Sequence, residues 1–159
     1  MGTMQKIAII VPCYNESLRF IGQEFIDYAK DNKEVYFIFV DDGSTDDTKE
    51  KINVLCRSNP EQILCLSLKK NHGKAEAVRH GFLKAIEMDF ENIGFWDVDL
   101  STPLKFINRF CELFDNHGIT AVMVASYYGR IKIAKLLIQY EADVNIQNNE
   151  GITALMAAR

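Results

Sequence analysis

The chain has 159 residues, about the usual size of one domain, so two ordinary domains would not fit in it. Its 48% hydrophobic and 25% charged residues are typical of a globular protein and exclude wholesale disorder. A net charge of −4 does not suggest a nucleic-acid-binding surface, and no apolar run approaches the ~20 residues of a membrane-spanning helix.

The first part of the chain alternates apolar strands with amphipathic helices. Short runs of apolar residues predict strands over 7–11, 35–40, 63–68 and 93–96. Apolar residues at helical spacing predict helices over 18–30, from 46 or 47 to 57, over 74–88, and from Thr102-Pro103 to about 114. Strands that are apolar on both faces and separated by helices predict a Rossmann-like α/β fold, with a parallel sheet covered by helices.

Polar segments follow three of these strands, at residues 14–16, 41–44 and 97–99. Parallel sheets bind their ligands beyond the carboxyl ends of the strands, so we expect these segments to form one site. Asp97 and Asp99 are two residues apart and can converge on one divalent cation, which typically takes one or two carboxylates, waters and substrate phosphates. The pattern therefore predicts a divalent cation with a diphosphate ligand, although a solvated turn would also explain it.

A second pattern begins after residue 114. The motif Gly118-Ile-Thr-Ala-Val-Met returns as Gly151-Ile-Thr-Ala-Leu-Met, a shift of 33 residues, which is the ankyrin period. With K-L-L-I and A-D-V-N between the two copies, residues 115–159 resemble about one and a third ankyrin repeats. This resemblance implies an all-α segment that binds a protein partner or self-associates. Because single repeats rarely stand alone, we expect it to pack on the α/β part, associate with another chain or be partly disordered.

Four ordered motifs in the first part carry a second resemblance: V-P-C-Y-N-E at 11–16, V-D-D-G-S-T-D at 40–46, N-H-G-K at 71–74 and D-V-D-L-S-T-P at 97–103. Together they resemble the inverting glycosyltransferases of family 2, which have the GT-A nucleotide-diphosphosugar fold. The last motif is most similar to the branch that moves sugars onto polyprenyl phosphates. The resemblance implies a nucleotide-diphosphosugar-binding part at residues 1–114, followed by the ankyrin-like segment at 115–159.

The resemblance also implies roles for the residues that match its motifs. The donor would be a UDP- or GDP-sugar, and Pro12, Tyr14 and Glu16 would line the nucleotide pocket. Asp41 would contact the base, and Asp42 would contact the same nucleoside region. Alternatively, Tyr14 only covers the sheet edge, and residues 41–44 form only an Asx-type turn with a helix cap.

On the phosphate side, Lys74 and Arg79 would lie near the phosphates or the sugar. Asp97 and Asp99 would face the donor phosphates and hold Mg²⁺ or Mn²⁺, with Asp99 as the more direct ligand. Some relatives hold the metal with a Gln at the position of Ser101, which is a weaker ligand. Alternatively, Lys74 and Arg79 form only a solvated helix face.

The cysteines and His72 carry less information. Cys13, Cys56, Cys65 and Cys111 are scattered without a CxxC pair, so we expect reduced thiols in a cytoplasmic protein. Cys13 lies in the site loop without a nearby histidine that would make it a nucleophile. His72 is expected to form hydrogen bonds rather than to act in catalysis.

No catalytic residue is identified, because the family's acceptor half and general base would follow the helix that ends near 114. The ankyrin-like segment follows there instead, which predicts donor binding without an acceptor site. The alternatives are a non-enzymatic, ankyrin-type interaction module, or an artificial fusion or truncated gene product joined near 114–115. A fusion would expose a sheet edge, and self-association is then expected.

Overall fold

The computed structural model describes residues 6–90, 92–109, 111, 126–127, 131–139 and 142–158. The chain divides into two compact units, Met1–Leu104 and Lys105–Arg159. The predicted boundary between residues 114 and 115 lies outside the described residues, as does the first copy of the repeated motif at 118–123.

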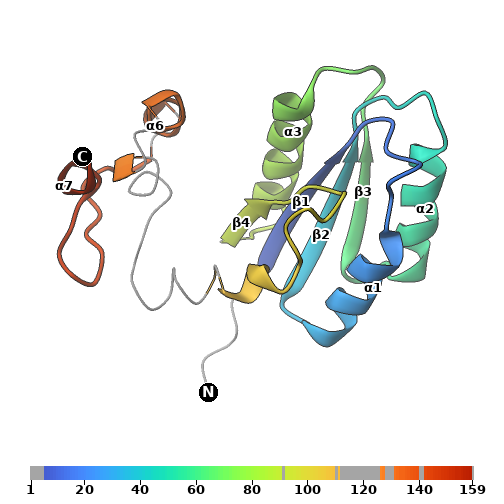
Figure 1. Ribbon diagram of the computed structural model, residues 1–159, viewed down its shortest axis with the longest axis horizontal. Coiled ribbons are helices and arrows are strands. Elements are labelled where there is room, and N and C mark those ends of the chain that lie inside the picture. Colours follow the sequence, from blue (N-terminus) through green and yellow to red (C-terminus); the bar gives the residue numbers. More distant parts are fainter. Residues whose placement is uncertain are drawn as a thin grey trace. The chain divides into compact units, whose positions relative to one another are not determined.

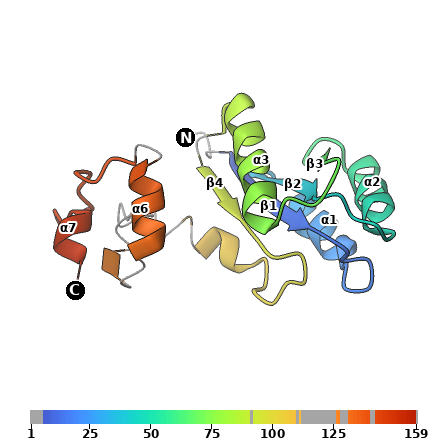
Figure 2. The same cartoon turned by 90° about the horizontal axis from the view of Figure 1, so that it is seen from above.

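The first unit is built on a parallel sheet of four strands in the order β3-β2-β1-β4 (Figure 1). Its strands are β1 (Ile7–Cys13), β2 (Val35–Asp41), β3 (Ile63–Ser67) and β4 (Asn92–Phe95). One face is covered by α3 (Lys74–Glu87), and the other by α1 (Gly22–Asp31) and α2 (Thr48–Ser58) (Figure 2). The predicted parallel α/β sheet with flanking helices is therefore confirmed.

The face under α3 is closely packed because its residues are small. Ala77 and Ala85 of α3 pack with Ile10 of β1 and Ile38 of β2 in one buried cluster. A Cβ atom added to Gly81 would lie 2.2 Å from Ile10 Cγ2, so the missing side chain lets the helix approach the strand. This packing holds α3 against the two central strands, and its first turn then lies near their carboxyl ends.

The opposite face is packed with aromatic rings. Phe25 of α1 makes edge-on contacts with Phe37 and Phe39 of β2, with ring centroids 5.1 Å apart in both pairs. All three side chains are fully buried. Such aromatic pairs stabilise a core by more than the burial of their apolar surface alone. Here they hold α1 against β2.

Two predicted helices begin later than expected. Residues 18–21 are not helical: Arg19 N donates to Glu16 O at 2.9 Å in a turn, and Leu18 is fully exposed. The helix expected from Thr102-Pro103 begins at residue 106 and is described over 106–109. The Thr102 carbonyl instead accepts a hydrogen bond from Trp96 Nε1 at 2.6 Å, which closes a loop after β4.

The expectation that the cysteines are all reduced is wrong for one pair. Cys56 in α2 and Cys65 in β3 form a disulfide, with their Cα atoms 6.4 Å apart. Their spacing of nine residues is not a recognisable motif. The pair arises because α2 packs against β3, and this contact depends on tertiary structure.

In the second unit, the described residues include α6 (Ile131–Gln139) and α7 (Ala154–Ala157), besides the helical residues 106–109. Thr153 caps α7, because its hydroxyl accepts a hydrogen bond from Met156 N at 3.4 Å. The turn before this cap is closed by Asn148 Oδ1, which accepts from Ile152 N at 2.8 Å. Across the part of the chain that the structure describes, no helix has the length and apolar character needed to cross a membrane.

Candidate functional site

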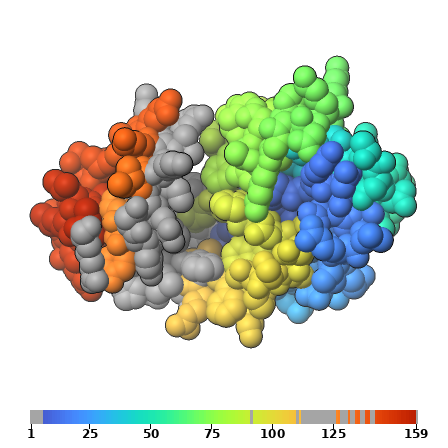
Figure 3. Space-filling model, turned by 45° about the horizontal axis from the view of Figure 1, so that its top comes forward, coloured from blue at the N-terminus to red at the C-terminus, as the bar shows by residue number. Residues whose placement is uncertain are grey.

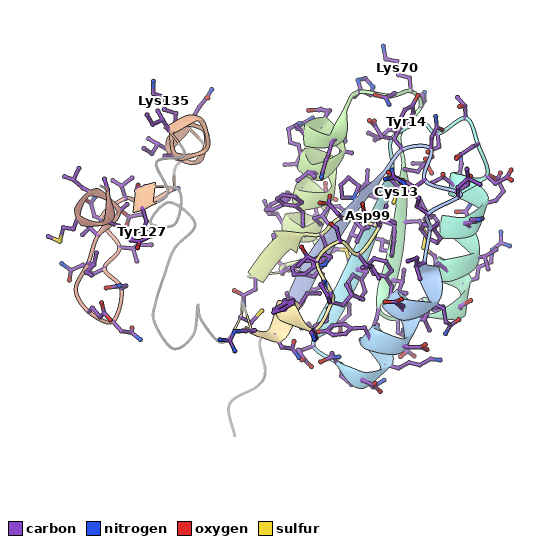
Figure 4. The ribbon with its side chains drawn as sticks, viewed as in Figure 1. Cys13, Tyr14, Lys70, Asp99, Tyr127 and Lys135 are labelled. Atoms are coloured by element: carbon purple, nitrogen blue, oxygen red, sulfur yellow. A yellow bond between two sulfur atoms is a disulfide. The ribbon has the colours of Figure 1, made fainter. Side chains whose placement is uncertain are left out.

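A pocket of about 500 Å³ lies at the carboxyl edge of the sheet. Because all four strands are parallel, the loops that follow them meet at this edge. Cys13, Tyr14 and Asp99 lie here in Figure 4. The pocket is lined by residues from the ends of the strands, the loops after them and the first turn of α3: Pro12, Cys13, Tyr14, Glu16, Asp42, Asn71, Gly73, Lys74, Ala77, Asp97, Val98 and Asp99.

The pocket brings together most of the predicted site residues, namely Pro12, Tyr14, Glu16, Asp42, Lys74, Asp97 and Asp99. Two predicted residues, Asp41 and Arg79, do not line it. Side chains that are separated by up to 87 positions in the sequence therefore share one cavity, as the topology of a parallel sheet predicts.

Asp41 has a structural environment instead. Its side chain is almost fully buried, and its Oδ1 accepts a hydrogen bond from Ser44 N at 3.1 Å. This is the turn that the alternative interpretation of residues 41–44 predicts. Residues 41–44 do not form the helix cap of that interpretation, because the N-cap of α2 is Asp47; Asp46 Oδ1 accepts from Thr48 N at 3.0 Å and from the Thr48 hydroxyl at 2.5 Å.

Arg79 is engaged on the surface of α3. Its Nε and Nη2 donate to Glu76 at 2.9 and 2.5 Å. The hydrogen bond from Arg79 is the main cause that lowers the pKa of Glu76. Arg79 follows Lys74 by five residues, which rotates it by about 140° around a helix with 3.6 residues per turn. The two cations therefore cannot share one helix face.

Asp42 links the loop after β2 to the beginning of α3. Its Oδ1 accepts from His72 N at 2.9 Å, and its Oδ2 accepts from Gly73 N at 2.7 Å. The contact with His72 uses its backbone N–H, so the expectation that the His72 side chain forms hydrogen bonds rather than acting in catalysis stays a prediction. Both oxygens of a nearly buried carboxylate are occupied, so Asp42 shapes the pocket wall from within.

Gly43 allows these two loops to approach each other. Its φ is +67°, which disfavours residues with a side chain. An added Cβ atom would lie 2.5 Å from the Lys70 carbonyl carbon and 2.6 Å from its Cα. The backbone of the loop after β3 occupies the space that a side chain would need.

The loop after β1 is fastened to the loop after β2 through Asn15. Its side-chain oxygen accepts from Thr45 N at 2.8 Å, while Asn15 N donates to Ser44 Oγ at 3.0 Å. Asn15 has a φ of +52°, in the left-handed region that Asn tolerates better than most residues. Glu16 N also donates to Thr48 Oγ1 at 2.8 Å. These bonds fix the positions of Tyr14 and Glu16 at the pocket.

Asp97 and Asp99 lie in the loop after β4. Leu100 N donates to Asp97 O at 3.2 Å in a tight turn, and Ser101 N donates to Asp99 Oδ1 at 3.1 Å. The backbone hydrogen bond from Ser101 is the main cause that lowers the pKa of Asp99, with Arg19 and Lys74 as further positive charges. Asp99 is therefore ionised at neutral pH.

Asp97 and Asp99 can hold a divalent cation if other molecules supply its remaining ligands. Among the described residues, no group of three or more His, Cys, Asp or Glu side chains could hold a metal ion. The two carboxylates of Asp97 and Asp99 suit Mg²⁺ or Mn²⁺, because such cations keep waters and substrate phosphates as their other ligands. Ser101 donates its backbone N–H to Asp99, and its expected weakness as a third ligand stays a prediction.

Both carboxylates of this loop contact cationic side chains. Lys74 Nζ donates to Asp97 Oδ1 and lies 5.8 Å from the centroid of the Phe95 ring. Arg19 Nη2 lies 2.8 Å from Glu16 Oε2, and Arg19 Nη1 lies 3.9 Å from Asp99 Oδ2. The segment after β1 and the loop after β4 are neighbours in the space-filling view, where they are blue and yellow (Figure 3).

Sequence reasoning did not identify Arg19. The predicted helix over 18–30 would have placed this residue in its first turn, whereas the observed turn directs it to Glu16 and Asp99. The signal was its position three residues after Glu16, but that spacing alone is common on protein surfaces. Asn71 and Gly73 also line the pocket and belong to the matched N-H-G-K motif without having been given a role.

Cys13 is present at the pocket but is not activated. Burial is the main cause that raises the pKa of its thiol far above the ordinary value, and the charges of Glu16 and Asp41 raise it further. The thiol faces Val11 O at 3.5 Å. A thiol that stays protonated is a poor nucleophile, which agrees with the prediction from sequence.

The first turn of α3 gives the pocket a positive wall. Gly73 is the N-cap, with a φ of +93°, and Lys74 is the first helical residue. Unpaired backbone N–H groups at a helix N-terminus favour anions such as phosphate. Lys74 lies beside them and its Nζ donates to Asp97, while Asp99 lines the same cavity.

Comparisons with known proteins agree with this geometry. The model of the family described as glycosyl transferase family 2 matches residues 8–153. An undecaprenyl-phosphate 4-deoxy-4-formamido-L-arabinose transferase from Proteus mirabilis is 28% identical over 67% of this chain and 32% of its own length. A dolichyl-phosphate beta-glucosyltransferase from Saccharomyces cerevisiae is 35% identical over 48% of this chain and 25% of its own length.

Among solved structures, a mannosyltransferase from Pyrobaculum calidifontis in complex with GDP-Man and Mn²⁺ has a similar fold. The TM-score is 0.51 with 22% sequence identity, over 65% of this chain and 30% of that one. The parallel α/β sheet thus matches the GT-A glycosyltransferase fold. The chain spans about a third or less of the length of these proteins. None of these comparisons supports the ankyrin-like segment.

Proposed function

The chain belongs to glycosyl transferase family 2, and we propose that its pocket binds a nucleotide-diphosphate sugar, a UDP- or GDP-sugar, as the donor for sugar transfer. The main support is the gathering of Tyr14, Lys74, Asp97 and Asp99 around one cavity of about 500 Å³. An aromatic ring, a cation and a pair of carboxylates are the groups that a base, a diphosphate and a divalent cation require. The mannosyltransferase of similar fold, with GDP-Man and Mn²⁺ bound, agrees with this proposal.

In this proposal, the donor lies across the carboxyl edge of the sheet. Tyr14, whose side chain is half-exposed, packs against the base or ribose, with Pro12 and Glu16 beside it. Lys74 and the N-terminus of α3 receive the diphosphate. Asp42 holds the loop that forms this end of the pocket, through its bonds to His72 N and Gly73 N.

Asp97 and Asp99 would hold a Mg²⁺ or Mn²⁺ ion, with donor phosphates and waters as its other ligands. A bound divalent cation neutralises charge that develops on the departing diphosphate. Residues of the chain supply the other contacts to the phosphates and to Asp99. Lys74 can leave Asp97 and donate to a phosphate oxygen, and Ser101 N keeps Asp99 ionised and oriented.

We propose a polyprenyl phosphate as the acceptor class. Its phosphate oxygen would bond to the anomeric carbon as the bond to the donor's β-phosphate oxygen breaks, and the nucleoside diphosphate leaves with the electron pair. An anionic oxygen needs no general base. This agrees with the described carboxylates of the pocket, which are all engaged: Asp42 by backbone N–H groups, Glu16 by Arg19, and Asp97 and Asp99 by cations.

A second candidate function concerns residues 115–159, which we propose to be an ankyrin-like protein-binding segment. In its support, the repeated motif places Thr153 at the N-cap of α7, and Asp143 of A-D-V-N accepts from Asn145 N at 2.8 Å. Sedimentation of the intact chain over a range of concentrations tests whether the partner is a second copy. Concentration-dependent association is expected, and a monomer at every concentration would contradict self-association.

Calorimetry with a panel of UDP- and GDP-sugars tests the donor proposal. We expect saturable binding of at least one of them in the presence of Mn²⁺ or Mg²⁺, and loss of binding when the cation is chelated. Absence of binding across the whole panel with either cation would overturn the proposal for this chain.

A further inference from the structure

We propose that Arg19 is a diphosphate-binding residue, which leaves Asp99 when a divalent cation binds there and then contacts the phosphates of the donor. This inference rests on the proposed function and assigns a role to a residue outside the matched motifs. It follows from the position of one guanidinium between two carboxylates of the pocket, Glu16 and Asp99.

The two contacts of Arg19 differ in strength. Its Nη2 donates to Glu16 Oε1 at 3.0 Å and lies 2.8 Å from Oε2, so both oxygens of Glu16 are within reach. Its Nη1 is 3.9 Å from Asp99 Oδ2, which is beyond hydrogen-bond distance. Glu16 is thus the anchor, and Asp99 is a partner held only by charge.

The anchor is also the more rigid group. The Glu16 side chain is only 17% exposed, and its backbone N–H is bonded to Thr48 Oγ1. Arg19 is three residues away in the same turn, and its side chain is 63% exposed. The guanidinium can therefore change its outer partner while Glu16 keeps it at the pocket rim.

A divalent cation on Asp99 would change the balance of charge at that rim. It would repel the guanidinium from Asp99 and would bring the donor diphosphate to the same place. Arginine has five N–H donors in a planar fork that fits two phosphate oxygens, and the bonds to Glu16 leave part of this fork available. The same side chain that weakens cation binding alone should therefore strengthen diphosphate binding.

The experiment measures these two opposite effects of Arg19, on the affinity for the cation alone and on the affinity for the diphosphate. Trp96 is the only tryptophan of the chain, directly precedes Asp97 and bonds across the loop to Thr102 O, so its fluorescence reports on cation binding. Mn²⁺ alone is titrated first, and GDP and UDP are then titrated in saturating Mn²⁺.

For Arg19→Gln, we expect Mn²⁺ alone to bind up to about fivefold more tightly, because an exposed ion pair is lost. We expect the nucleoside diphosphate to bind about tenfold more weakly, because a charge-assisted hydrogen bond is lost.

Arg57→Gln is the matched control, since Arg57 is an exposed residue in the last turn of α2 and does not line the pocket. It should leave both affinities unchanged. Arg19→Lys keeps the charge without the fork, and it should restore the wild-type Mn²⁺ affinity but only part of the diphosphate affinity.

The outcomes separate the two proposals. If the wild-type chain binds neither GDP nor UDP with Mn²⁺, the proposed function and this inference both fail. If the wild type binds and Arg19→Gln changes neither affinity, or weakens both, only the role of Arg19 is overturned.

Discussion

The Asp42 carboxylate accepts a hydrogen bond from Gly73 N at 2.7 Å, across 31 positions of sequence. This bond joins the end of β2 to the N-cap of α3, and the other oxygen of Asp42 binds His72 N. Asp42 and Gly73 both line the pocket. The wall that presents Lys74 to the cavity is thus held by one buried carboxylate.

Asp42→Asn should destabilise the chain and disturb the pocket. An amide is neutral and has only one acceptor oxygen, so both backbone N–H groups lose a charged partner and one of them also loses its acceptor on residue 42. Hydrogen bonds to charged groups contribute about 1.5–3 kcal/mol each, and a loss of this order is expected in the free energy of unfolding by urea. Asp47→Asn is the control, because Asp47 is exposed and makes no side-chain cap bond. Equal stability of the two variants would contradict the role given to Asp42.

Gly43→Ala should cost more stability than Gly73→Ala. Both glycines have positive φ, so both substitutions carry a backbone cost of about 1–3 kcal/mol. At Gly43 the new methyl group would also meet the Lys70 backbone at 2.5 Å, whereas no atom lies within 4 Å at Gly73. Thermal unfolding of the two variants measures the difference. If Gly73→Ala proves the more damaging, the close approach of the two loops is wrong.

Lys74→Gln and Arg79→Gln separate the two cations that the sequence placed together in the site. Lys74 lines the pocket, and Arg79 bonds to Glu76 on α3. With Mn²⁺ present, we expect Lys74→Gln to weaken GDP or UDP binding about tenfold, through loss of a charge-assisted bond. Arg79→Gln should leave that affinity within a factor of two, by calorimetry. The reverse order would show that the described pocket is not the diphosphate site.

The Asp46 carboxyl group should make the free energy of unfolding depend on pH in the acid range. Hydrogen bonds, first of all from the Thr48 hydroxyl, lower its pKa from the ordinary value of 3.8 to about 2. The pKa of Asp46 is lower in the folded chain than in the unfolded chain. The ionised Asp46 carboxylate therefore stabilises the fold above pH 3.8, and this stabilisation is lost as the pH falls towards 2. Urea unfolding should therefore show a difference between wild type and Asp46→Asn at pH 6 that narrows below pH 4. A difference that is constant from pH 6 to pH 2.5 would exclude this origin.

Much of the fold could be predicted from the sequence, because the strands are continuous apolar runs and the helices have one apolar face. Parallel pairing then required the loops after β1, β2 and β4 to meet, which brought Tyr14, Asp42 and Asp99 to one pocket. The start of α1 was missed because residues 15–17 are held by hydrogen bonds to residues 44–48, which no local sequence pattern indicates.

Individual side-chain roles were harder to predict for the same reason. The family resemblance placed Arg79 in the site with Lys74, but helix geometry turns it away from Lys74 and Glu76 binds it. Asp41 and Asp42 are adjacent and chemically identical, yet one closes a local turn and the other bridges two loops. The Cys56–Cys65 disulfide depends on the packing of α2 against β3.

Cation-dependent binding of a nucleotide sugar, measured on the wild type and on Asp97→Asn and Asp99→Asn, tests the central claim most directly. Calorimetry with UDP- and GDP-sugars in Mn²⁺ should show one saturable event for the wild type. Each variant should bind at least about tenfold more weakly, since each loses a charged ligand of the cation. Wild-type binding that persists unchanged in both variants, or after chelation of the cation, would contradict the assignment of this pocket.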